Sequence, residues 1–451
     1  MSSNRIAFLP LARTTFDMEL AAAVTGQMRT VLAAAGLELV GPDALITDLT
    51  AAQAAARELA GQEADLLLVF QATFADSTMV AALAEASDAP LFLWAVPEPA
   101  TGGRLRLNSL CGINLAGHAL TLRGRTYSYA YAEPGEPVAL ARLLALAAAG
   151  NVRRRLKSAR LGVVGEHPAG MDTCHLDEAT LAAKFGLAVR RIELAEVFQR
   201  ARAVPEVHTA AVRASLDRRL DNLAELEQTP LTGTLNVYSA LKQIAEEERL
   251  DGLAVRCWPE FFTEMGCAGC GAMSLLSDGF GGATPLPCSC EADINGTVTQ
   301  LILQWLAGAP AFGTDIVAMD FAADTIAVWH CGLAPLSMAD PAFQPHGTIH
   351  SNRRVPLVLE FPLKPGQVTV ARLSQATGEL RFVLSQGEML ALPKPFSGTA
   401  GTLRLQVPAQ RFFDALMREG LEHHVSLAYG SYLPALEALA ELTGVPVYKL
   451  V

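Results

Sequence analysis

Apolar positions in the first third of the chain follow two alternating patterns. Short runs of consecutive apolar residues at 5–12, 64–72 and 89–96 are typical of strands buried on both faces. The segment 15–35 instead places its apolar residues three and four positions apart, as an amphipathic helix does. Because buried strands that alternate with amphipathic helices indicate a doubly wound parallel sheet, we expect a Rossmann-like α/β domain over residues 1–157.

The same alternation starts again after the charged segment 152–157. It predicts a second Rossmann-like α/β domain with a parallel sheet over residues 158–345. No GxGxxG motif follows its first strand, so a dinucleotide site is poorly supported. The apolar runs that carry this prediction lie in the segments 158–174, 183–194 and 251–262.

From residue 355 the pattern changes to short strands of alternating apolar and polar residues. These strands read VPLVLEF, QVTVARLS, ELRFVLSQ and TLRLQV, with turn residues between them. Such a pattern is typical of an antiparallel sheet or a small barrel. A final helix and strand follow, so we expect a C-terminal α+β domain with an antiparallel β-barrel over residues 346–451.

The composition describes a well-buried acidic protein. Of 451 residues, 51% are hydrophobic and 18% are charged, and the net charge is −11. The longest basic run is Arg153–Arg155, so nucleic acid and anionic membranes are poor partners. No apolar window reaches roughly 18 residues and the start lacks a secretion signal, so we expect a soluble, cytoplasmic protein without a membrane partner.

The eight cysteines lead to an expectation about their redox state. In the absence of a secretion signal, we expect them to be reduced rather than paired. The spacing of Cys267 and Cys270 is that of a redox or zinc pair, but no second pair lies at zinc-finger distance. Small buried thiols explain the pair better than structural zinc. The glycine-rich segment 266–282 around it has no clear periodicity, and we expect a loop that covers the functional site.

The first candidate for chemistry is Glu291. It lies between the short apolar run that ends at Cys290 and the helical pattern that starts near Asp293. Asp293 and Asn295 are good capping residues for the start of that helix. Glu291 therefore lies at a strand–helix junction, where α/β folds bind ligands, although a glutamate in a first turn also stabilises the helix dipole.

The second candidate is a predicted hairpin over residues 312–331. A turn centred near residues 322 and 323 makes Asp320 face Thr325 and Asp315 face His330. Directly opposed residues share one face of an antiparallel pair, so Asp315 and His330 are expected to be neighbours. A slip of one residue would break this pairing.

Further candidates lie at strand ends. Arg13 follows the first predicted strand, Gln71 ends the third, and Trp258 and Glu260 follow a strand of the second domain. The carboxyl edge of a parallel sheet is where ligands bind, so we expect these side chains to contact substrate: Trp258 by stacking on a sugar ring, and Glu260 by bonding hydroxyls or carrying a proton. Arg13 as a solvated surface charge remains an alternative.

Two consecutive histidines complete the set. His423 and His424 come directly before a predicted strand. Adjacent side chains on a strand point to opposite faces, so at most one is expected to face a common site. Two carboxylates and an imidazole are the ligand types of a divalent ion such as Mn²⁺, with Co²⁺ and Mg²⁺ as alternatives, and they leave positions open for a substrate with adjacent oxygens.

Four motifs together resemble the L-fucose isomerase and L-arabinose isomerase superfamily, in particular its fucose-isomerase-like branch. They are CEADING, the strand that carries Asp315, WHCG and EGLEHH, and the likeness covers nearly the whole chain. The resemblance implies a Mn²⁺-dependent aldose–ketose isomerase that acts on a small-molecule sugar. It also implies a homo-oligomer, a trimer or hexamer, with sites at subunit interfaces.

The resemblance also implies roles for individual residues. Glu291 and Asp315 match the two metal-binding carboxylates, which also act as acid and base. His424 matches the C-terminal metal histidine, which leaves His423 as a substrate contact. His330 matches an additional histidine ligand of the arabinose branch, and Arg13 becomes a substrate contact that reaches a neighbouring subunit's site.

The substrate remains open at this point. RCWPEF and the cysteine-rich segment match neither named enzyme, so the substrate could be a modified or anionic hexose such as a sulfonated sugar. Arg13, Arg353 and Arg354 are candidates to meet an anionic group. An alternative of another class is a non-catalytic sugar-binding or sensor protein whose metal site is structural.

Overall fold

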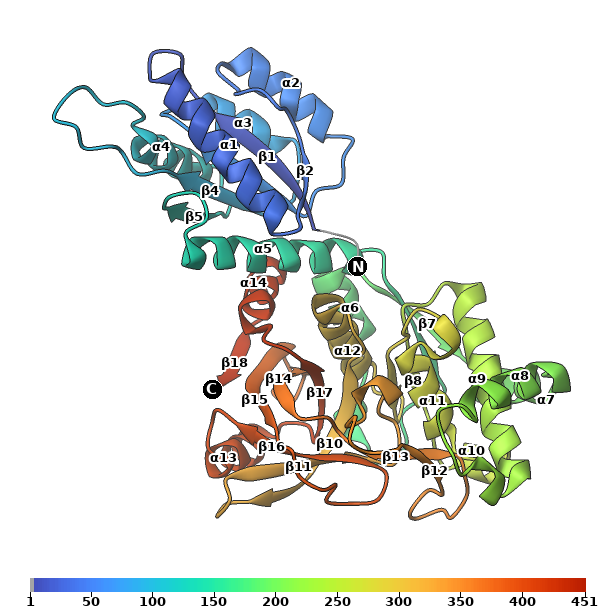
Figure 1. Ribbon diagram of the computed structural model, residues 1–451. Coiled ribbons are helices and arrows are strands. Elements are labelled where there is room, and N and C mark those ends of the chain that lie inside the picture. Colours follow the sequence, from blue (N-terminus) through green and yellow to red (C-terminus); the bar gives the residue numbers. More distant parts are fainter. Residues whose placement is uncertain (1–3) are drawn as a thin grey trace. The chain divides into compact units, whose positions relative to one another are not determined.

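The computed structural model describes residues 4–451, which form two compact units. The first unit contains the chain up to Arg155 together with Pro434–Leu442, and the second contains Leu156–Leu433 and Thr443–Val451. Figure 1 shows the elements of both units in the colours of the sequence. None of the helices in residues 4–451 has the length and apolarity that a bilayer span requires.

The first unit is a five-stranded parallel sheet with helices on both faces, as the sequence predicts. The strand order is β2-β1-β3-β4-β5, and each neighbouring pair is parallel. Asp17, Asp48 and Asp76 each accept a hydrogen bond from an amide in the first turn of a helix, so they cap α1, α2 and α3. The strands are β1 (Arg5–Leu11), β2 (Glu38–Val40), β3 (Leu66–Gln71), β4 (Leu91–Ala95) and β5 (Ser128–Tyr131), and the helices are α1 (Met18–Ala34), α2 (Leu49–Leu59), α3 (Ser77–Glu85), α4 (Ser109–Leu122) and α5 (Pro137–Leu156), with most of α14 (Leu433–Thr443).

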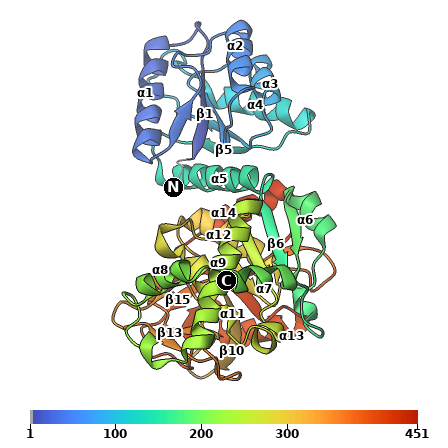
Figure 2. The same ribbon diagram turned by 90° about the vertical axis from the view of Figure 1, so that its right-hand side faces the viewer.

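Two separate cores explain why this sheet is doubly wound. Ile6 and Phe8 of β1 pack in the core that contains α1 and α5, whereas Ala7, Leu9 and Leu11 pack in the core that contains α2, α3 and α4. Figure 2 shows α1 on one side of β1 and α2, α3 and α4 on the other. Because successive residues of a strand face opposite sides, a continuous apolar run can fill both cores.

The second unit begins with a smaller parallel sheet. Its strand order is β7-β6-β8-β9, again with every pair parallel. This arrangement confirms the second Rossmann-like α/β segment. The strands are β6 (Arg160–Val164), β7 (Ala188–Ile192), β8 (Gly252–Val255) and β9 (Cys288–Cys290), and the helices are α6 (Glu178–Phe185), α7 (Leu194–Arg202), α8 (Glu206–Leu216), α9 (Gln228–Glu248), α10 (Glu260–Thr263), α11 (Gly269–Asp278) and α12 (Ile294–Ala307).

The rest of this unit is a closed antiparallel β-barrel, as the alternating pattern predicts. Six strands pair in the order β16-β11-β10-β17-β14-β15, and β15 pairs back with β16. Three short strands extend the sheet: β12 pairs with β13, β13 pairs with β16, and β18 pairs with β15. The bounds are β10 (Phe312–Asp320), β11 (Thr325–His330), β12 (His346–Thr348), β13 (Val358–Pro362), β14 (Gly366–Ser374), β15 (Arg381–Met389), β16 (Thr399–Leu405), β17 (His424–Tyr429), β18 (Val447–Leu450) and helix α13 (Ala409–Glu419).

The expected covering loop at 266–282 is wrong. Most of this segment forms α11, and every residue from Gly269 to Ser277 is buried. A helix that is buried on all sides has no polar face, so its sequence carries no helical period. Gly271 shows how tightly α11 packs, because a Cβ at this position would lie 2.4 Å from the carbonyl oxygen of Leu357.

Candidate functional site

Glu291 lies at the strand–helix junction that the sequence predicts. It follows β9 directly, and α12 begins three residues later at Ile294. Glu291 and Ala292 both have left-handed backbone conformations, with φ of 58° and 55°. Such conformations cost about 1–3 kcal/mol each in residues other than glycine and are concentrated at functional sites. Asp293 ends the turn by accepting a hydrogen bond from the Gly296 amide at 2.9 Å, which caps α12.

The barrel places Asp315 opposite His424 and not opposite His330, which corrects the predicted hairpin pairing. Asp320 faces Thr325 as expected, but a β-bulge between Ile316 and Ala318 shifts the register by one residue. Asp315 therefore pairs with Trp329 on β11. On its other side it lies directly across from His424 of β17.

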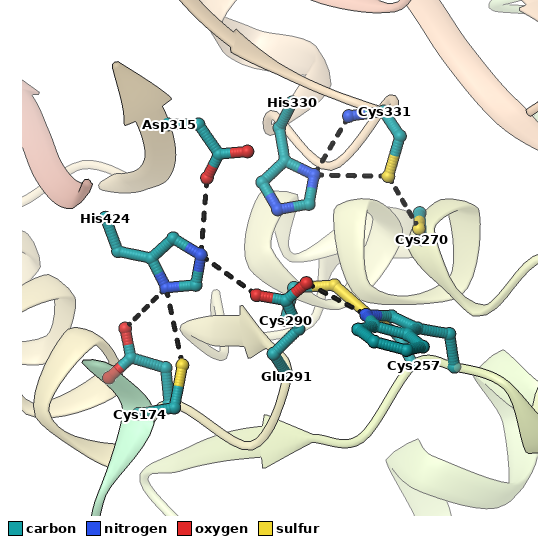
Figure 3. The surroundings of a disulfide bond; sticks show 11 residues. Cys174, Cys257, Cys270, Cys290, Glu291, Asp315, His330, Cys331 and His424 are labelled. Atoms are coloured by element: carbon teal, nitrogen blue, oxygen red, sulfur yellow. Dashed lines mark hydrogen bonds and ion pairs between the residues drawn. A yellow bond between two sulfur atoms is a disulfide. The ribbon is translucent and has the colours of Figure 1, made fainter. Parts of the chain in front are cut away.

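Three ligand atoms from three elements converge at this point, as Figure 3 shows. Nε2 of His424 lies 3.0 Å from Oε2 of Glu291 and 3.3 Å from Oδ1 of Asp315. Both carboxylate oxygens are shielded from solvent and, among residues 4–451, have no hydrogen-bond partner beyond this contact with His424. Buried carboxylate oxygens without partners are costly unless a cation neutralises them. Carboxylates and an imidazole that face a common point therefore fit a divalent ion such as Mn²⁺.

His423 also reaches this point, so the expectation that only one of the two histidines faces the site is wrong. One ligand atom each from Asp315, His423 and His424 lie within 4.8 Å of one another, and the two imidazole centroids are 4.4 Å apart. The alternation of side chains holds within a strand, and β17 begins only at His424. His423 precedes the strand and is free of that constraint.

Two buried residues hold His424 from its other side. Nδ1 of His424 lies 2.9 Å from Oδ2 of Asp293, and the same oxygen accepts a hydrogen bond of 2.5 Å from Arg372. The carboxylate thereby directs Nε2 towards Glu291 and Asp315, an arrangement that orients histidine ligands in metal sites. Sγ of Cys174 also lies 3.8 Å from Nδ1 of His424. The sequence predicts Asp293 only as a helix cap, and it does not predict a role for Arg372 or Cys174. A single arginine in the apolar strand QVTVARLS was the available signal.

The electrostatics of this group match its geometry. Burial would raise the pKa of Asp293, but the Arg372 guanidinium and His424 outweigh it and hold the pKa well below its ordinary value. Burial would likewise raise the pKa of Glu291, and His424 lowers it instead. Burial alone would lower the pKa of His424, yet Asp293, Cys174 and Glu291 raise it well above the ordinary value. The site therefore favours positive charge between its carboxylates.

A cleft of about 300 Å³ opens beside these residues. Nε1 of Trp258 donates a hydrogen bond of 2.9 Å to Oε1 of Glu291, so this predicted residue lies at the site. Glu260 does not lie there: it forms an ion pair of 2.7 Å with Arg256 and lines a separate cavity. The cleft is lined by Glu291, Asp315, Trp258, Trp329, Asn352 and Arg353, among others.

His330 lines the same cleft but has a different environment from His424. Its Nδ1 accepts a hydrogen bond of 2.9 Å from the Cys331 amide. Burial lowers the pKa of His330, although Asp315 opposes this effect, so the ring is neutral. In the part of the chain that the structure describes, His330 is not a member of any group of three ligand atoms that converge.

Arg13 and Gln71 both belong to the first unit. Arg13 is exposed and forms an ion pair of 3.1 Å with Asp76. Gln71 ends β3, is fully buried, and its amide atoms have no hydrogen-bond partner among residues 4–451. Both side chains therefore lie at the carboxyl edge of the first sheet, where the sequence places them.

Two of the eight cysteines form a disulfide, so the expectation of reduced thiols is wrong for this pair. Cys257 and Cys290 are joined, with their Cα atoms 5.8 Å apart. Cys290 ends β9, and Cys257 follows the neighbouring parallel strand β8, so strand pairing brings two residues that are 33 positions apart to bonding distance. The bond lies beside Glu291 (Figure 3).

Comparison with known proteins agrees with this site and fold. Residues 7–146 match the fucose/sulfoquinovose isomerase N-terminal domain, and residues 358–450 match the L-fucose isomerase C-terminal domain. The chain is 30% identical to sulfoquinovose isomerases from Priestia aryabhattai, over 98% of both chains, and from Alkalicoccus urumqiensis, over 99% of both chains. It is also 28% identical to the sulfoquinovose isomerase of Clostridium sp. (strain MSTE9) over 98% of both chains. The chain therefore belongs to the fucose/sulfoquinovose isomerase family and is an aldose–ketose isomerase.

Proposed function

We propose that the protein converts a sulfonated aldose, sulfoquinovose or a close analogue, into the corresponding ketose with the help of Mn²⁺. The observation that carries the proposal is the convergence of Nε2 of His424 with Oε2 of Glu291 and Oδ1 of Asp315, two buried carboxylate oxygens that have no hydrogen-bond partner beyond His424. The names of the full-length relatives support the sulfonated substrate.

The residues present fit a divalent cation. Glu291, Asp315 and His424 would hold it, with His423 close enough to contact a bound sugar or to complete the set. When bound, the ion supplies Lewis-acid polarisation of the substrate oxygens. Mn²⁺ suits the mixed carboxylate and imidazole ligands, and Co²⁺ and Mg²⁺ are the alternatives to compare with it.

The two carboxylates carry the proton between carbons. One of Glu291 and Asp315 takes the proton from C2 of the open-chain sugar, and the C1 carbonyl oxygen gains a proton from solvent as the enediol forms. The other carboxyl group, protonated at the start, gives its proton to C1 while the hydroxyl at C2 releases its proton to solvent and becomes the new carbonyl. Exchange with solvent then restores both carboxyl groups. Trp258 donates its hydrogen bond to Oε1 of Glu291, while Oε2 faces His424.

The mouth of the cleft offers a cation for the sulfonate. Arg353 lines the cleft and is exposed, and Asn352 beside it adds a polar side chain. The guanidinium of Arg353 lies 5.7 Å from the centre of the Phe262 ring, which limits its range of positions. A planar guanidinium binds an oxyanion through two parallel hydrogen bonds, so Arg353 suits a sulfonate group. Arg354 does not line the cleft.

The experiment that tests this function follows proton exchange at C2 by NMR. Metal-stripped protein is incubated in D₂O with sulfoquinovose and with neutral aldoses such as glucose and fucose, with and without Mn²⁺. We expect Mn²⁺-dependent deuterium incorporation and ketose formation with the sulfonated sugar. Exchange only with a neutral sugar would overturn the substrate, and exchange without any metal would overturn the role of Mn²⁺.

The likeness to the family supports two further parts of the proposal. The protein forms a homo-oligomer based on a trimer, with Arg13 of one chain contacting sugar bound in a neighbouring chain, and it works in the cytoplasm. Light scattering combined with size-exclusion chromatography tests the assembly. A monomer that turns over sugar at the full rate would contradict it.

A further inference from the structure

A second group of metal-binding atoms lies in the same cleft, apart from Glu291, Asp315 and His424. One ligand atom each from Cys270, Cys331 and His350 lie within 4.8 Å of one another. Sγ of Cys270 is 3.0 Å from Sγ of Cys331. The three residues come from separate segments: Cys270 from α11, Cys331 from directly after β11, and His350 from the segment after β12. Figure 3 shows the two thiols in contact beside His330.

The surrounding residues hold this group in place and leave it accessible from the cleft. Cys270 is 1% exposed and Cys331 is 8% exposed, so both thiols are held by their surroundings. The His350 ring packs edge-on against Phe262, with their centroids 5.1 Å apart. All three residues nevertheless line the cleft of about 300 Å³, so an ion in the cleft can reach them.

Only one of the two cysteines of the CxxC motif belongs to this group. Cys270 joins the group, whereas Cys267 at the other end of the motif lies outside it and is fully buried. A Cβ on Gly233 would lie 3.3 Å from Sγ of Cys267, so that thiol packs against α9 instead. The motif therefore contributes one ligand, and Cys331 supplies the thiol that the spacing alone leaves missing.

We propose that Cys270, Cys331 and His350 form a second site that binds a thiophilic divalent ion, Zn²⁺ above all. Two thiolates and one imidazole are the ligands of open zinc sites, in which a fourth position stays free for water or substrate. The ion binds as both thiols release their protons to solvent, and the free position faces the cleft.

Binding of Zn²⁺ requires only a small change in the distance between the two sulfur atoms. With Zn–S bonds of about 2.3 Å and a tetrahedral angle, two coordinated sulfur atoms lie about 3.8 Å apart. The present separation of 3.0 Å therefore has to open by less than about 1 Å. Sγ of Cys331 also lies 3.2 Å from Nδ1 of His330.

The two sites differ in the kind of ion they select. Glu291 and Asp315 offer oxygen ligands, which suit Mn²⁺ and Mg²⁺, whereas Cys270 and Cys331 offer sulfur, which suits Zn²⁺. An ion on the thiols occupies part of the volume that a sugar needs. Zn²⁺ at this site therefore inhibits the isomerase in competition with the sugar, even when Mn²⁺ is present in excess.

Cobalt reports directly on thiolate ligands. Metal-stripped protein, kept reduced with a phosphine, is titrated with Co²⁺ while the thiolate-to-cobalt charge-transfer band in the near ultraviolet is recorded. We expect this band in the unmodified protein and its displacement by Zn²⁺. The variants Cys270→Ser and Cys331→Ser should lose most of the band, and Cys267→Ser, a buried thiol three residues from Cys270, should keep it.

Inhibition gives a second readout. The concentration of Zn²⁺ that halves activity, measured for each variant relative to its own uninhibited rate, should rise at least about tenfold in Cys270→Ser and stay unchanged in Cys267→Ser. The proposal fails if reduced protein shows no thiolate band, if Cys267→Ser loses the band as fully as Cys270→Ser, or if peptide mass spectrometry finds Cys270 and Cys331 joined as a disulfide that the phosphine does not open.

Discussion

Asp315 and His424 are direct neighbours across two antiparallel strands of the barrel. They lie opposite each other in the pairing of β10 with β17, with Oδ1 and Nε2 3.3 Å apart. Glu291 reaches the same point from the end of a parallel strand in the other half of the second unit. The hydrogen-bonded register of the barrel therefore positions two of the ligands, and Asp293, the N-cap of α12, orients His424.

The buried pair of Asp293 and Arg372 predicts a measurable loss of stability. Both side chains are 2% exposed, so replacing Asp293 by Asn leaves the buried guanidinium with one remaining anionic partner, Glu422, at 4.0 Å. We expect Asp293→Asn to lower the free energy of unfolding by about 3–5 kcal/mol, measured by urea titration of the metal-free protein. The double variant Asp293→Asn with Arg372→Met should recover part of this loss, since the guanidinium is removed together with its partner, while Glu422 loses its 4.0 Å ion pair.

The same two variants separate stability from metal affinity. Because both lack the carboxylate that orients His424, both should bind Mn²⁺ about 10–100-fold more weakly than the unmodified protein. An affinity that recovers together with stability in the double variant would show that Asp293 acts through the fold alone.

The raised pKa of His424 predicts that metal binding releases a proton. Asp293, Cys174 and Glu291 outweigh burial and keep His424 protonated in the metal-free protein near pH 7. An ion has to displace this proton, so the apparent affinity for Mn²⁺ should fall about tenfold for each pH unit below the raised pKa and level off above it. Calorimetric titrations at pH 7 in buffers of different protonation enthalpy should count one proton.

His330 provides the control for proton release. Burial lowers its pKa, so it is already neutral and has no proton to give. His330→Gln should therefore still release one proton on binding Mn²⁺. A count of zero in the unmodified protein would mean that His424 is neutral before the metal binds.

Much of the fold follows from periodicity because it depends on local pattern. The alternation of apolar runs with amphipathic segments indicates the parallel sheets, and the period-two strands indicate the barrel. Glu291 was found through its position between a strand and a helix cap. The turn of the hairpin was also correct, since Asp320 does face Thr325.

The details that failed depend on contacts between distant segments. The bulge near Val317 shifts Asp315 by one residue, and simple alternation contains no signal for an extra residue. The Cys257–Cys290 bond depends on the pairing of β8 with β9, which spacing along the chain does not reveal. Likewise, α11 is buried on all sides and loses the period that would identify it as a helix.

Glu291 and Glu260 form a matched pair for testing the proton carriers. Their side chains are 17% and 22% exposed and each has a single cationic or imidazole partner, but only Glu291 faces the converging ligands. We expect Glu291→Gln to reduce C2 proton exchange by about 10²–10⁴-fold with an unchanged far-ultraviolet circular dichroism spectrum. Glu260→Gln should exchange at nearly the normal rate.

The opposite result for this pair is equally informative. A similar loss in Glu260→Gln would return Glu260 to the role of proton carrier, despite its ion pair with Arg256. Near-normal exchange in Glu291→Gln would mean that the acid and base are other groups.

The position of Arg353 predicts which substrates its removal affects. A hydrogen bond between charged groups contributes about 1.5–3 kcal/mol, so Arg353→Gln should lower kcat/KM for a sulfonated aldose by about 10–100-fold, mainly through KM. A neutral aldose has no partner for this guanidinium and should react at an unchanged rate. Steady-state kinetics with both sugars measure the difference.

Arg354→Gln is the matched control for Arg353→Gln. Arg354 is the exposed neighbour that does not line the cleft, so its loss should not change kcat/KM for either sugar. Equal losses for both sugars in Arg353→Gln would mean that Arg353 supports the shape of the cleft and does not recognise the sulfonate.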